Sequence, residues 1–257
     1  MVTRTIALGP ELDWLEDDTE ESLLGTMWHQ RIIVSTVNSL TRYNRQAERG
    51  WIIGNQLMLI IPRQSGARPY QPSPDIFIHT ATDFPPDRPS LRVTDYGPPA
   101  LALEICSPST AYQHDLDTIN PDAKPQVYGR IGVLEYLVYD PTDTIIRERP
   151  GIRAWHAGPD GRYVPWLAGA DGRWHSRLGI SFGVEGILLR VYDPEGRVIP
   201  NNEDMDAIVA AREALLAYQE QQLAEREAQI AQQDAQLAER EARIVALEAQ
   251  LRRQRGE

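Results

Sequence analysis

The sequence predicts an α/β fold in which helices flank a mixed β-sheet, with a small antiparallel β extension and a long C-terminal helix. Three observations lead to this fold class. Short apolar runs that suit strands alternate with segments of helical spacing ahead of residue 147. Aromatic residues separated by glycine-containing turns follow in residues 147–200, and residues 201–257 have a composition typical of one uninterrupted helix.

The chain begins with residues 1–19, which are polar and acidic and which we expect to form an arm outside the folded domain. A helix is expected at about residues 20–48, because acidic residues occupy its first turn and apolar residues recur at helical spacing. The apolar positions of this helix are Leu23, Leu24, Met27, Ile32, Ile33, Val37 and Leu40.

Five apolar segments predict the strands of the mixed sheet. The first two are joined tightly, and the fourth follows a long polar connection that contains five prolines. A helix between the fourth and fifth strands begins after Asp122, a candidate N-cap, with Pro125 in its first turn. The strands are expected near residues 51–54, 56–61, 75–78, 101–106 and 135–140, and this helix near residues 123–131.

Residues 147–200 predict antiparallel strands, because turn sequences such as Pro159-Asp160-Gly161 and Ala170-Asp171-Gly172 separate the short segments. The aromatic side chains of this region could stack on nucleic-acid bases, but packing against a sheet is the favoured interpretation. The aromatic residues concerned are Trp155, Tyr163, Trp166, Trp174 and Phe182.

The C-terminal region predicts one long helix, because no proline or glycine lies between Asn202 and Arg255. Apolar residues recur every seven positions, as in a coiled coil, although most residues three and four positions later are polar. We therefore expect residues 203–255 to mediate self-association as a coiled coil; the alternative is a solvated charged helix. The anchors of the repeat are Leu216, Leu223, Ile230, Leu237, Ile244 and Leu251.

The net charge of −11 is distributed unevenly. Residues 1–28 carry seven acids and one arginine (−6), and residues 201–257 carry twelve acids and seven arginines (−5), which leaves the middle of the chain balanced. A basic surface is typical of nucleic-acid-binding proteins, so the composition gives no support for tight DNA binding. A single cysteine excludes an internal disulfide and a cysteine-rich metal site.

The apolar runs indicate no membrane partner. None of them reaches the length of a membrane span. The first residues are too acidic, and their apolar run too short, for a signal peptide. We therefore expect a cytoplasmic protein.

Asp75, Glu104 and Lys124 are the main candidate site residues. Strand alternation within residues 101–106 places Glu104 on the face opposite to the three large aliphatic side chains, where a carboxylate is costly unless it is paired or bound to a cation. Lys124 is the only lysine beside 25 arginines, which suggests a position that requires a compact amine. If Asp75 and Glu104 lie on neighbouring strands, their carboxylates can converge on one hard cation such as Mg²⁺.

These residues resemble the Uma2-like endonucleases, a family within the PD-(D/E)XK nuclease superfamily, over roughly residues 29–194. The combination of E-x-x-S-P-S-T with GV-x-EY-x-x-x-DP is specific, whereas Pro74-Asp75 alone is not. One departure is that Cys106 stands where the E-x-K element has its lysine, and the resemblance implies that Lys124 on the following helix supplies the amine. The matching segments are Pro74-Asp75, residues 101–110, Lys124 with Tyr128, Gly132-Val133 and residues 135–141.

The resemblance implies a restriction-endonuclease-like fold and metal-dependent hydrolysis of phosphodiester bonds in nucleic acid, with DNA as the expected substrate. Asp75 and Glu104 would hold Mg²⁺ or Mn²⁺, and Lys124 would position the attacking water or stabilise charge on the phosphate. The alternative function is a non-catalytic scaffold that retains the nuclease fold and oligomerises through its C-terminal helix. We divide the chain into the arm 1–19, a nuclease-like domain 20–200 with its β extension at about 147–200, and the helix 201–257.

Further candidates lie close to this site in the sequence or in the expected fold. His29 is either a core-edge histidine or a substrate contact. Asp115 and Asp117 either join the metal site or are solvated. Glu20 and Glu21, at the start of the first helix, could add another acid to the metal site.

Two other features near Glu104 have simpler interpretations. Cys106 is most simply a small buried hydrophobic residue, because a thiol nucleophile would need a nearby histidine and only His114 is close in the sequence. The turn at residues 107–110 is expected to shape the exit of the strand rather than to supply a nucleophile.

Overall fold

The computed structural model describes residues 20–62, 69–81, 88–106 and 114–255, with side chains described from residue 27 to residue 251 within these ranges. The chain divides into two compact units, Met1–Asn202 and Glu203–Glu257. The expected arm at residues 1–19 and the expected turn at residues 107–110 lie outside the described residues.

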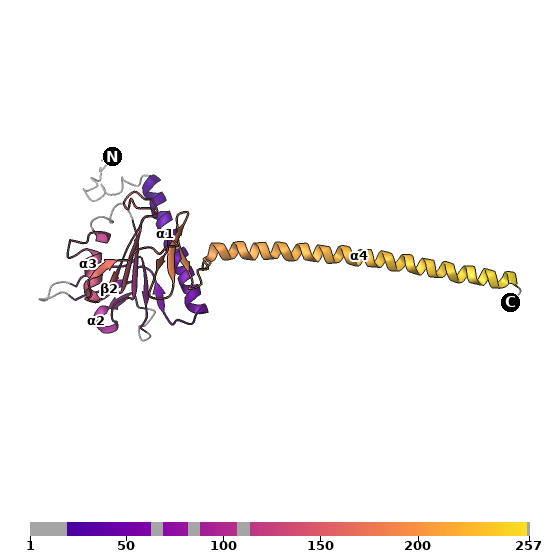
Figure 1. Ribbon diagram of the computed structural model, residues 1–257, viewed down its shortest axis with the longest axis horizontal. Helices are drawn as coiled ribbons and strands as arrows, with labels where there is room; N and C mark the ends of the chain where they lie inside the picture. The colour runs from indigo at the N-terminus through magenta and orange to yellow at the C-terminus, as the bar shows by residue number, and fades with distance from the viewer. Residues whose placement is uncertain (1–19, 63–68, 82–87, 107–113, 256–257) are drawn as a thin grey trace, which may run out of the picture. The chain divides into compact units, whose positions relative to one another are not determined.

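A mixed sheet forms the centre of the first unit (Figure 1). Its six strands follow the order β1-β3-β5-β6-β7-β8. β5 and β6 are parallel, and the other neighbouring pairs are antiparallel. This arrangement confirms the predicted α/β class with a mixed sheet. The strands are β1 (Ile52–Gly54), β3 (Ile76–His79), β5 (Leu101–Ile105), β6 (Glu135–Tyr139), β7 (Ile152–Ala157) and β8 (Tyr163–Pro165).

Each face of the sheet is covered by a helix and a smaller sheet. Helix α1 (Glu20–Gln46) lies against one face (Figure 1), together with the antiparallel sheet of β9 (Trp174–His175), β10 (Ser181–Glu185) and β11 (Leu188–Tyr192). Helix α3 (Lys124–Ile131) lies on the opposite face.

The alternation of side chains in β5 separates the two cores. Leu101, Leu103 and Ile105 belong to the core under α1, whereas Ala102 and Cys106 belong to the core under α3. The face assignment made from strand alternation is therefore confirmed, and it places the Glu104 side chain on the α3 face of the sheet.

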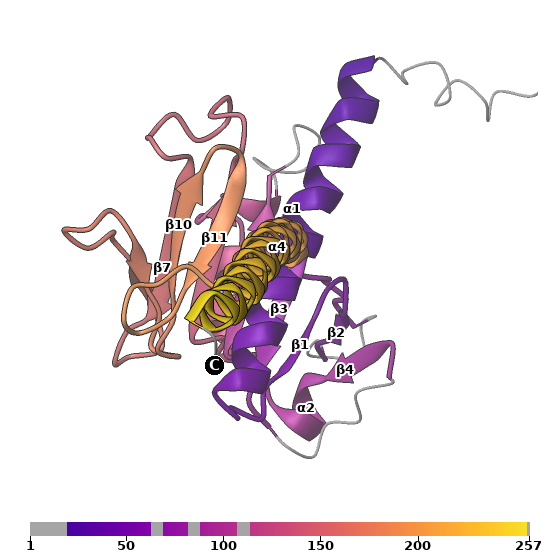
Figure 2. The same cartoon turned by 90° about the vertical axis from the view of Figure 1, so that its right-hand side faces the viewer.

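The second predicted strand is placed differently from the prediction. β2 (Met58–Ile60) does not pair with β1; it forms a separate parallel pair with β4 (Ser90–Arg92), and Figure 2 shows β2 and β4 beside one another. The long polar connection therefore contains a strand, and it also contains the short helix α2 (Val93–Tyr96), neither of which was predicted. Side-chain burial explains why β2 lies apart from β1, because Leu57, Leu59 and Ile61 are buried in the core under α3.

The antiparallel pattern predicted for residues 147–200 is confirmed, but the region is not one separate extension. β7 and β8 continue the main sheet from β6, and only β9, β10 and β11 form a sheet of their own. The aromatic residues of this region pack as predicted. Trp155 stacks on Tyr136 in the core under α3, whereas Trp166 and Phe182 meet edge to face in the core under α1.

Both predicted helices of the first unit are present, with one correction at an N-terminus. The N-cap of α3 is Ala123, which makes no side-chain cap, rather than Asp122. The helix ends at Ile131, before Gly132 in the left-handed conformation. The second unit consists of helix α4 (Asn202–Arg255), as predicted from its composition. Within the part of the chain that the structure describes, no helix is long and apolar enough to cross a membrane.

Asp140 holds the loop that connects β6 to β7. Its side chain is buried and accepts hydrogen bonds from the backbone N–H groups of Thr142, Ile145 and Ile146, at 3.0, 2.7 and 2.9 Å. Hydrogen bonds from these groups and from the Thr142 hydroxyl outweigh the opposing effect of burial and hold the pKa of Asp140 below its ordinary value.

Replacing Asp140 with Asn should lower the free energy of unfolding by about 1–3 kcal/mol, because the amide nitrogen cannot accept the bonds from Ile145 and Ile146. Urea denaturation at neutral pH measures this loss. The matched control is Asp160→Asn in an exposed turn, expected to change stability by less than about 0.5 kcal/mol. Equal effects of the two substitutions would show that Asp140 does not stabilise the loop.

Candidate active site

Asp75 and Glu104 are brought together by two adjacent strands. Asp75 immediately precedes β3, and the antiparallel pairing of Ile76 with Leu103 places the two acids side by side at the end of the pair. The backbone N–H of Ile105 donates to Asp75 Oδ2 at 2.8 Å, and the backbone N–H of Asp75 donates to Glu104 Oε2 at 3.3 Å. The carboxylates are therefore fixed by the backbone of each other's strand.

Lys124 reaches the same place from the α3 face of the sheet. Its Nζ lies 3.0 Å from Glu104 Oε2 and 2.9 Å from Asp115 Oδ1. A cation at the first residue of a helix is opposed by the helix dipole. The two carboxylates offset that unfavourable interaction, so the position of Lys124 depends on them.

The cluster has a buried side and an open side. Glu104 and Asp115 are almost completely buried, whereas the side chains of Asp75, Lys124 and His29 are 18%, 17% and 22% exposed. Among the described residues of the cluster, these three side chains are therefore the ones that a small molecule or a phosphate group could reach.

Burial and mutual repulsion act strongly on the two inner carboxylates. Burial raises the pKa of Glu104 to about 8, with Lys124 opposing the shift and Asp75 and Asp115 adding to it. Burial likewise raises the pKa of Asp115, again with Lys124 opposing the shift. An additional cation near these acids would favour their ionised forms.

The amine of Lys124 is held in its charged form. Burial lowers the pKa of Lys124, but the attraction of Glu104 and Asp115 outweighs burial and leaves the pKa raised. Lys124 therefore stays protonated at neutral pH. It can donate hydrogen bonds and stabilise negative charge, but it cannot act as a general base.

Two further side chains hold the acids in place. The hydroxyl of Tyr128, one turn after Lys124 in α3, donates to Glu104 Oε1 at 3.2 Å, and burial raises the pKa of Tyr128 well above its ordinary value. His29 projects from α1 with Nε2 3.1 Å from Asp75 Oδ2, a hydrogen bond that raises the pKa of His29. The role of Tyr128 was missed, although its spacing of four residues from Lys124 was available as a signal.

The structure separates the remaining candidates. Asp117 does not join the cluster; it is partly exposed and accepts hydrogen bonds from the backbone N–H groups of Ile119 and Asn120 in its own turn. The side chains of Glu20 and Glu21 lie outside the described residues.

Cys106 is buried, as expected from its sequence position. Burial raises the pKa of its thiol, which opposes formation of a nucleophilic thiolate. His114, the one histidine close to it in the sequence, is exposed. The simpler interpretation of Cys106 as a small buried hydrophobic residue is therefore the one that agrees with its surroundings.

The donor atoms of the cluster suit a hard divalent cation. Among the described side chains, no group of three or more His, Cys, Asp or Glu residues is arranged to hold a metal ion alone. Mg²⁺ does not require such a cage, because it is commonly held by one or two carboxylates and completes its shell with water and substrate oxygens. Asp75 and Glu104 offer such a pair of carboxylates beside one another.

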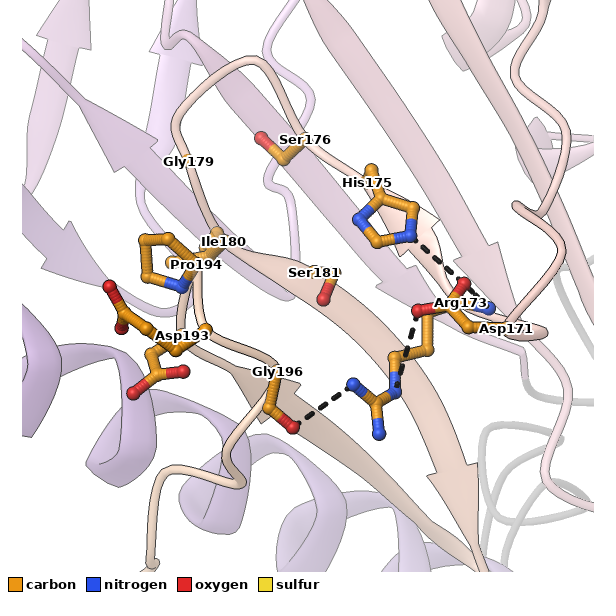
Figure 3. A pocket seen from close by; sticks show the side chains of 11 residues that line it. Asp171, Arg173, His175, Ser176, Gly179, Ile180, Ser181, Asp193, Pro194 and Gly196 are labelled. Atoms are coloured by element: carbon orange, nitrogen blue, oxygen red, sulfur yellow. Dashed lines mark hydrogen bonds and ion pairs between the residues drawn. The ribbon is translucent and has the colours of Figure 1, made fainter.

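A cavity of about 480 Å³ lies elsewhere, between the turns that flank β9, β10 and β11 (Figure 3). Two polar contacts join residues of its lining: Arg173 donates to the carbonyl oxygen of Gly196 at 3.1 Å, and His175 lies 2.9 Å from Asp171. None of the clustered residues around Glu104 lines this cavity. Its contacts hold turns together, and we assign no chemistry to it.

Comparison with protein families gives one match that covers most of the first unit. The model of the family Uma2, described as "Putative restriction endonuclease", matches residues 11–185. This range includes Asp75, Glu104 and Lys124 and ends within β10. Comparison with curated proteins gives no match.

Replacing Lys124 with Met should lower the free energy of unfolding by about 3 kcal/mol, because two buried carboxylates then lack their shared cation. Adding Glu104→Gln to this variant should restore part of the loss, since it removes one of the two buried acids that are left without a cation. Urea denaturation of both variants at neutral pH measures the difference. A double variant no more stable than Lys124→Met alone would contradict the assigned pairing.

Proposed function

Because this chain belongs to the Uma2 family, we propose that it is a metal-dependent endonuclease that hydrolyses phosphodiester bonds, with DNA as its substrate. The observation that carries the proposal is the meeting of Asp75, Glu104 and Lys124 at a partly open position. Glu104 contacts the amine of Lys124 and accepts a hydrogen bond from the backbone of Asp75, and two carboxylates with an amine form the minimal set for metal-assisted hydrolysis of a phosphodiester. They come from three separate elements, so their contact is a property of the fold.

Asp75 and Glu104 are the residues that would hold Mg²⁺ or Mn²⁺. Both are fixed by backbone hydrogen bonds, so little ordering remains to be done when a cation binds. The bound ion would supply Lewis-acid polarisation of a phosphate oxygen and a water of lowered pKa. Asp115, which shares Lys124 with Glu104, would keep the amine aligned rather than bind the ion.

Lys124 contributes as a cation. Because its amine stays protonated, it orients an attacking water or stabilises the charge that develops on the phosphate. The amine of Lys124 lies about 3 Å from a carboxylate oxygen of Glu104 and about 3 Å from one of Asp115. The guanidinium group of arginine is too large and too rigid to take its place. This requirement accounts for one lysine in a chain that otherwise uses arginine.

His29 would act at the open edge of the site. Its contact with Asp75 fixes the rotamer of an acid that is otherwise partly exposed. We propose that His29 positions Asp75 and contacts the substrate phosphate, since both side chains lie on the accessible side of the cluster.

The second candidate function is a non-catalytic scaffold. It is favoured by the charge balance, because residues 29–200 carry no net positive charge to attract nucleic acid. In this alternative the acids and Lys124 form a purely structural buried network, and α4 provides the activity of the protein by self-association. The two functions differ in one property that can be measured directly, which is metal-dependent cleavage.

The proposed nuclease should cleave supercoiled plasmid DNA when Mg²⁺ or Mn²⁺ is added and should stop when EDTA removes the metal. Asp75→Asn and Glu104→Gln should each reduce the rate by about 10²-fold or more, because each removes a ligand charge. Asp117→Asn is the matched control, since Asp117 is an acid outside the cluster, and it should retain the wild-type rate.

Single-stranded DNA and RNA assayed in parallel test the substrate class. Faster cleavage of RNA than of DNA would correct the substrate while leaving the nuclease proposal intact. A wild-type chain that cleaves none of these substrates with either metal would favour the scaffold.

We also propose that residues 203–255 mediate self-association. The full chain should sediment as a dimer or larger species, and a chain that ends at residue 202 should sediment as a folded monomer. The truncation retains Asn201, because its amide donates to Ser35 of α1 at 2.7 Å. Identical oligomeric states of the two chains in analytical ultracentrifugation would refute the role of the tail.

A further inference from the structure

Helix α4 carries an uninterrupted row of aliphatic side chains at a spacing of seven residues. Each of these side chains is about half exposed, with exposed fractions from 48% to 58%. Such a row on a soluble protein indicates a partner surface. We name the following seven residues the anchor stripe: Val209, Leu216, Leu223, Ile230, Leu237, Ile244 and Leu251.

The two sides of the anchor stripe differ in charge. Residues three positions after an anchor lie on one side of the stripe, and residues four positions after lie on the other. One side, the arginine flank, consists of Arg212, Gln219, Arg226, Gln233 and Arg240. The other side, the acidic flank, consists of Glu213, Glu220, Glu227, Asp234, Glu241 and Glu248.

The arginine flank has no acid in position to pair with it along the helix. No Asp or Glu stands three or four residues from Arg212, Arg226 or Arg240. A solitary charged helix is normally supported by such pairs, and the sequence of α4 has two, Glu239 with Arg243 away from the stripe and Glu248 with Arg252 at the end of the acidic flank. The arginines that border the anchor stripe are therefore arranged for a partner outside their own helix.

Charge complementarity identifies both the partner and its direction. In a parallel pair of identical helices that meet along the stripe, the arginine flank of each helix faces the acidic flank of the other. In an antiparallel pair, each flank faces its own copy, so six acids oppose six acids. The first arrangement is attractive at the three arginine positions of the flank, and the second is repulsive.

We propose that α4 binds α4 of a second copy of this chain as a parallel, in-register pair. This inference rests on the self-association proposed above and does not depend on nuclease activity. Arg226 of one chain then faces Glu227 of the other, and the same pairing recurs at Arg212 with Glu213 and Arg240 with Glu241. Anchors of the same number meet across the pair.

The parallel direction has a consequence for the nuclease units. Both are attached to the N-terminal end of α4, so a parallel pair joins them at one end of the helices. An antiparallel pair would attach them at opposite ends, separated by the helix length of about 80 Å. A parallel pair would therefore attach the two proposed nuclease sites at the same end of the paired helices.

Cysteine cross-linking of the full chain tests the direction. Val209→Cys and Leu251→Cys should each form disulfide-linked dimers under mild oxidation, because equal numbers meet in a parallel pair. Ile230→Cys, at the centre of the stripe, should cross-link in either direction and reports association alone. The wild-type chain, whose one cysteine is the buried Cys106, is the control and should remain uncross-linked.

The cross-linking results distinguish the direction of the helix pair from self-association itself. A mixture of the Val209→Cys and Leu251→Cys chains that cross-links, while neither does so alone, would establish the antiparallel pair and overturn the proposal. Absence of cross-linking even for Ile230→Cys, with a sedimentation mass of one 29.0 kDa chain, would overturn self-association itself.

Charge reversal provides a second test that uses no cysteine. Changing Arg212, Arg226 and Arg240 to Glu should weaken a parallel dimer by about tenfold or more, because acids then face acids. Also changing Glu213, Glu227 and Glu241 to Arg should restore the affinity by exchanging the flanks. The control, Glu225→Arg with Glu239→Arg on the opposite face of α4, should leave the dimer unchanged, and equal weakening by this control would overturn the assignment of the flanks.

Discussion

The candidate site depends on the ion pairs that the amine of Lys124 makes with Glu104 and Asp115. Two buried carboxylates that share one amine repel one another, and each would carry a large desolvation penalty if it were alone. The shared cation of Lys124 offsets part of this repulsion and of the desolvation penalty. A divalent cation beside Asp75 and Glu104 would favour the ionised forms of these acids, which burial opposes.

The fold supplies this cluster from elements that are far apart in the sequence. The antiparallel pair β3 and β5 fixes the two acids, α3 brings the amine and Tyr128 to the face of β5, and α1 brings His29 to Asp75. Packing on both faces of the sheet holds these elements rigidly, because β5 is buried over its whole length. The open side of the site thus lies where Asp75 precedes β3 and Lys124 begins α3.

Much of this arrangement could be predicted from the sequence, and the failures have physical reasons. Alternation in β5 and the lone lysine identified Glu104 and Lys124 as unusual, because both break a local pattern that has a clear energetic basis. The pairing of β2 with β4 was missed, because a short apolar run does not specify which strand it joins. Asp115 and Asp117 could not be told apart, since their difference lies in the tertiary contact with Lys124 and not in their sequence neighbours.

The proposal that Asp75 and Glu104 form a metal site can be tested directly by one binding measurement. Mn²⁺ titrated into the full chain can be followed by electron paramagnetic resonance, because the signal of the free ion decreases when the ion binds to the protein. The account predicts saturable binding to the wild-type chain, strong weakening in Glu104→Gln, and unchanged binding in Asp117→Asn. Equal binding by all three chains, or no binding by the wild type, would contradict it.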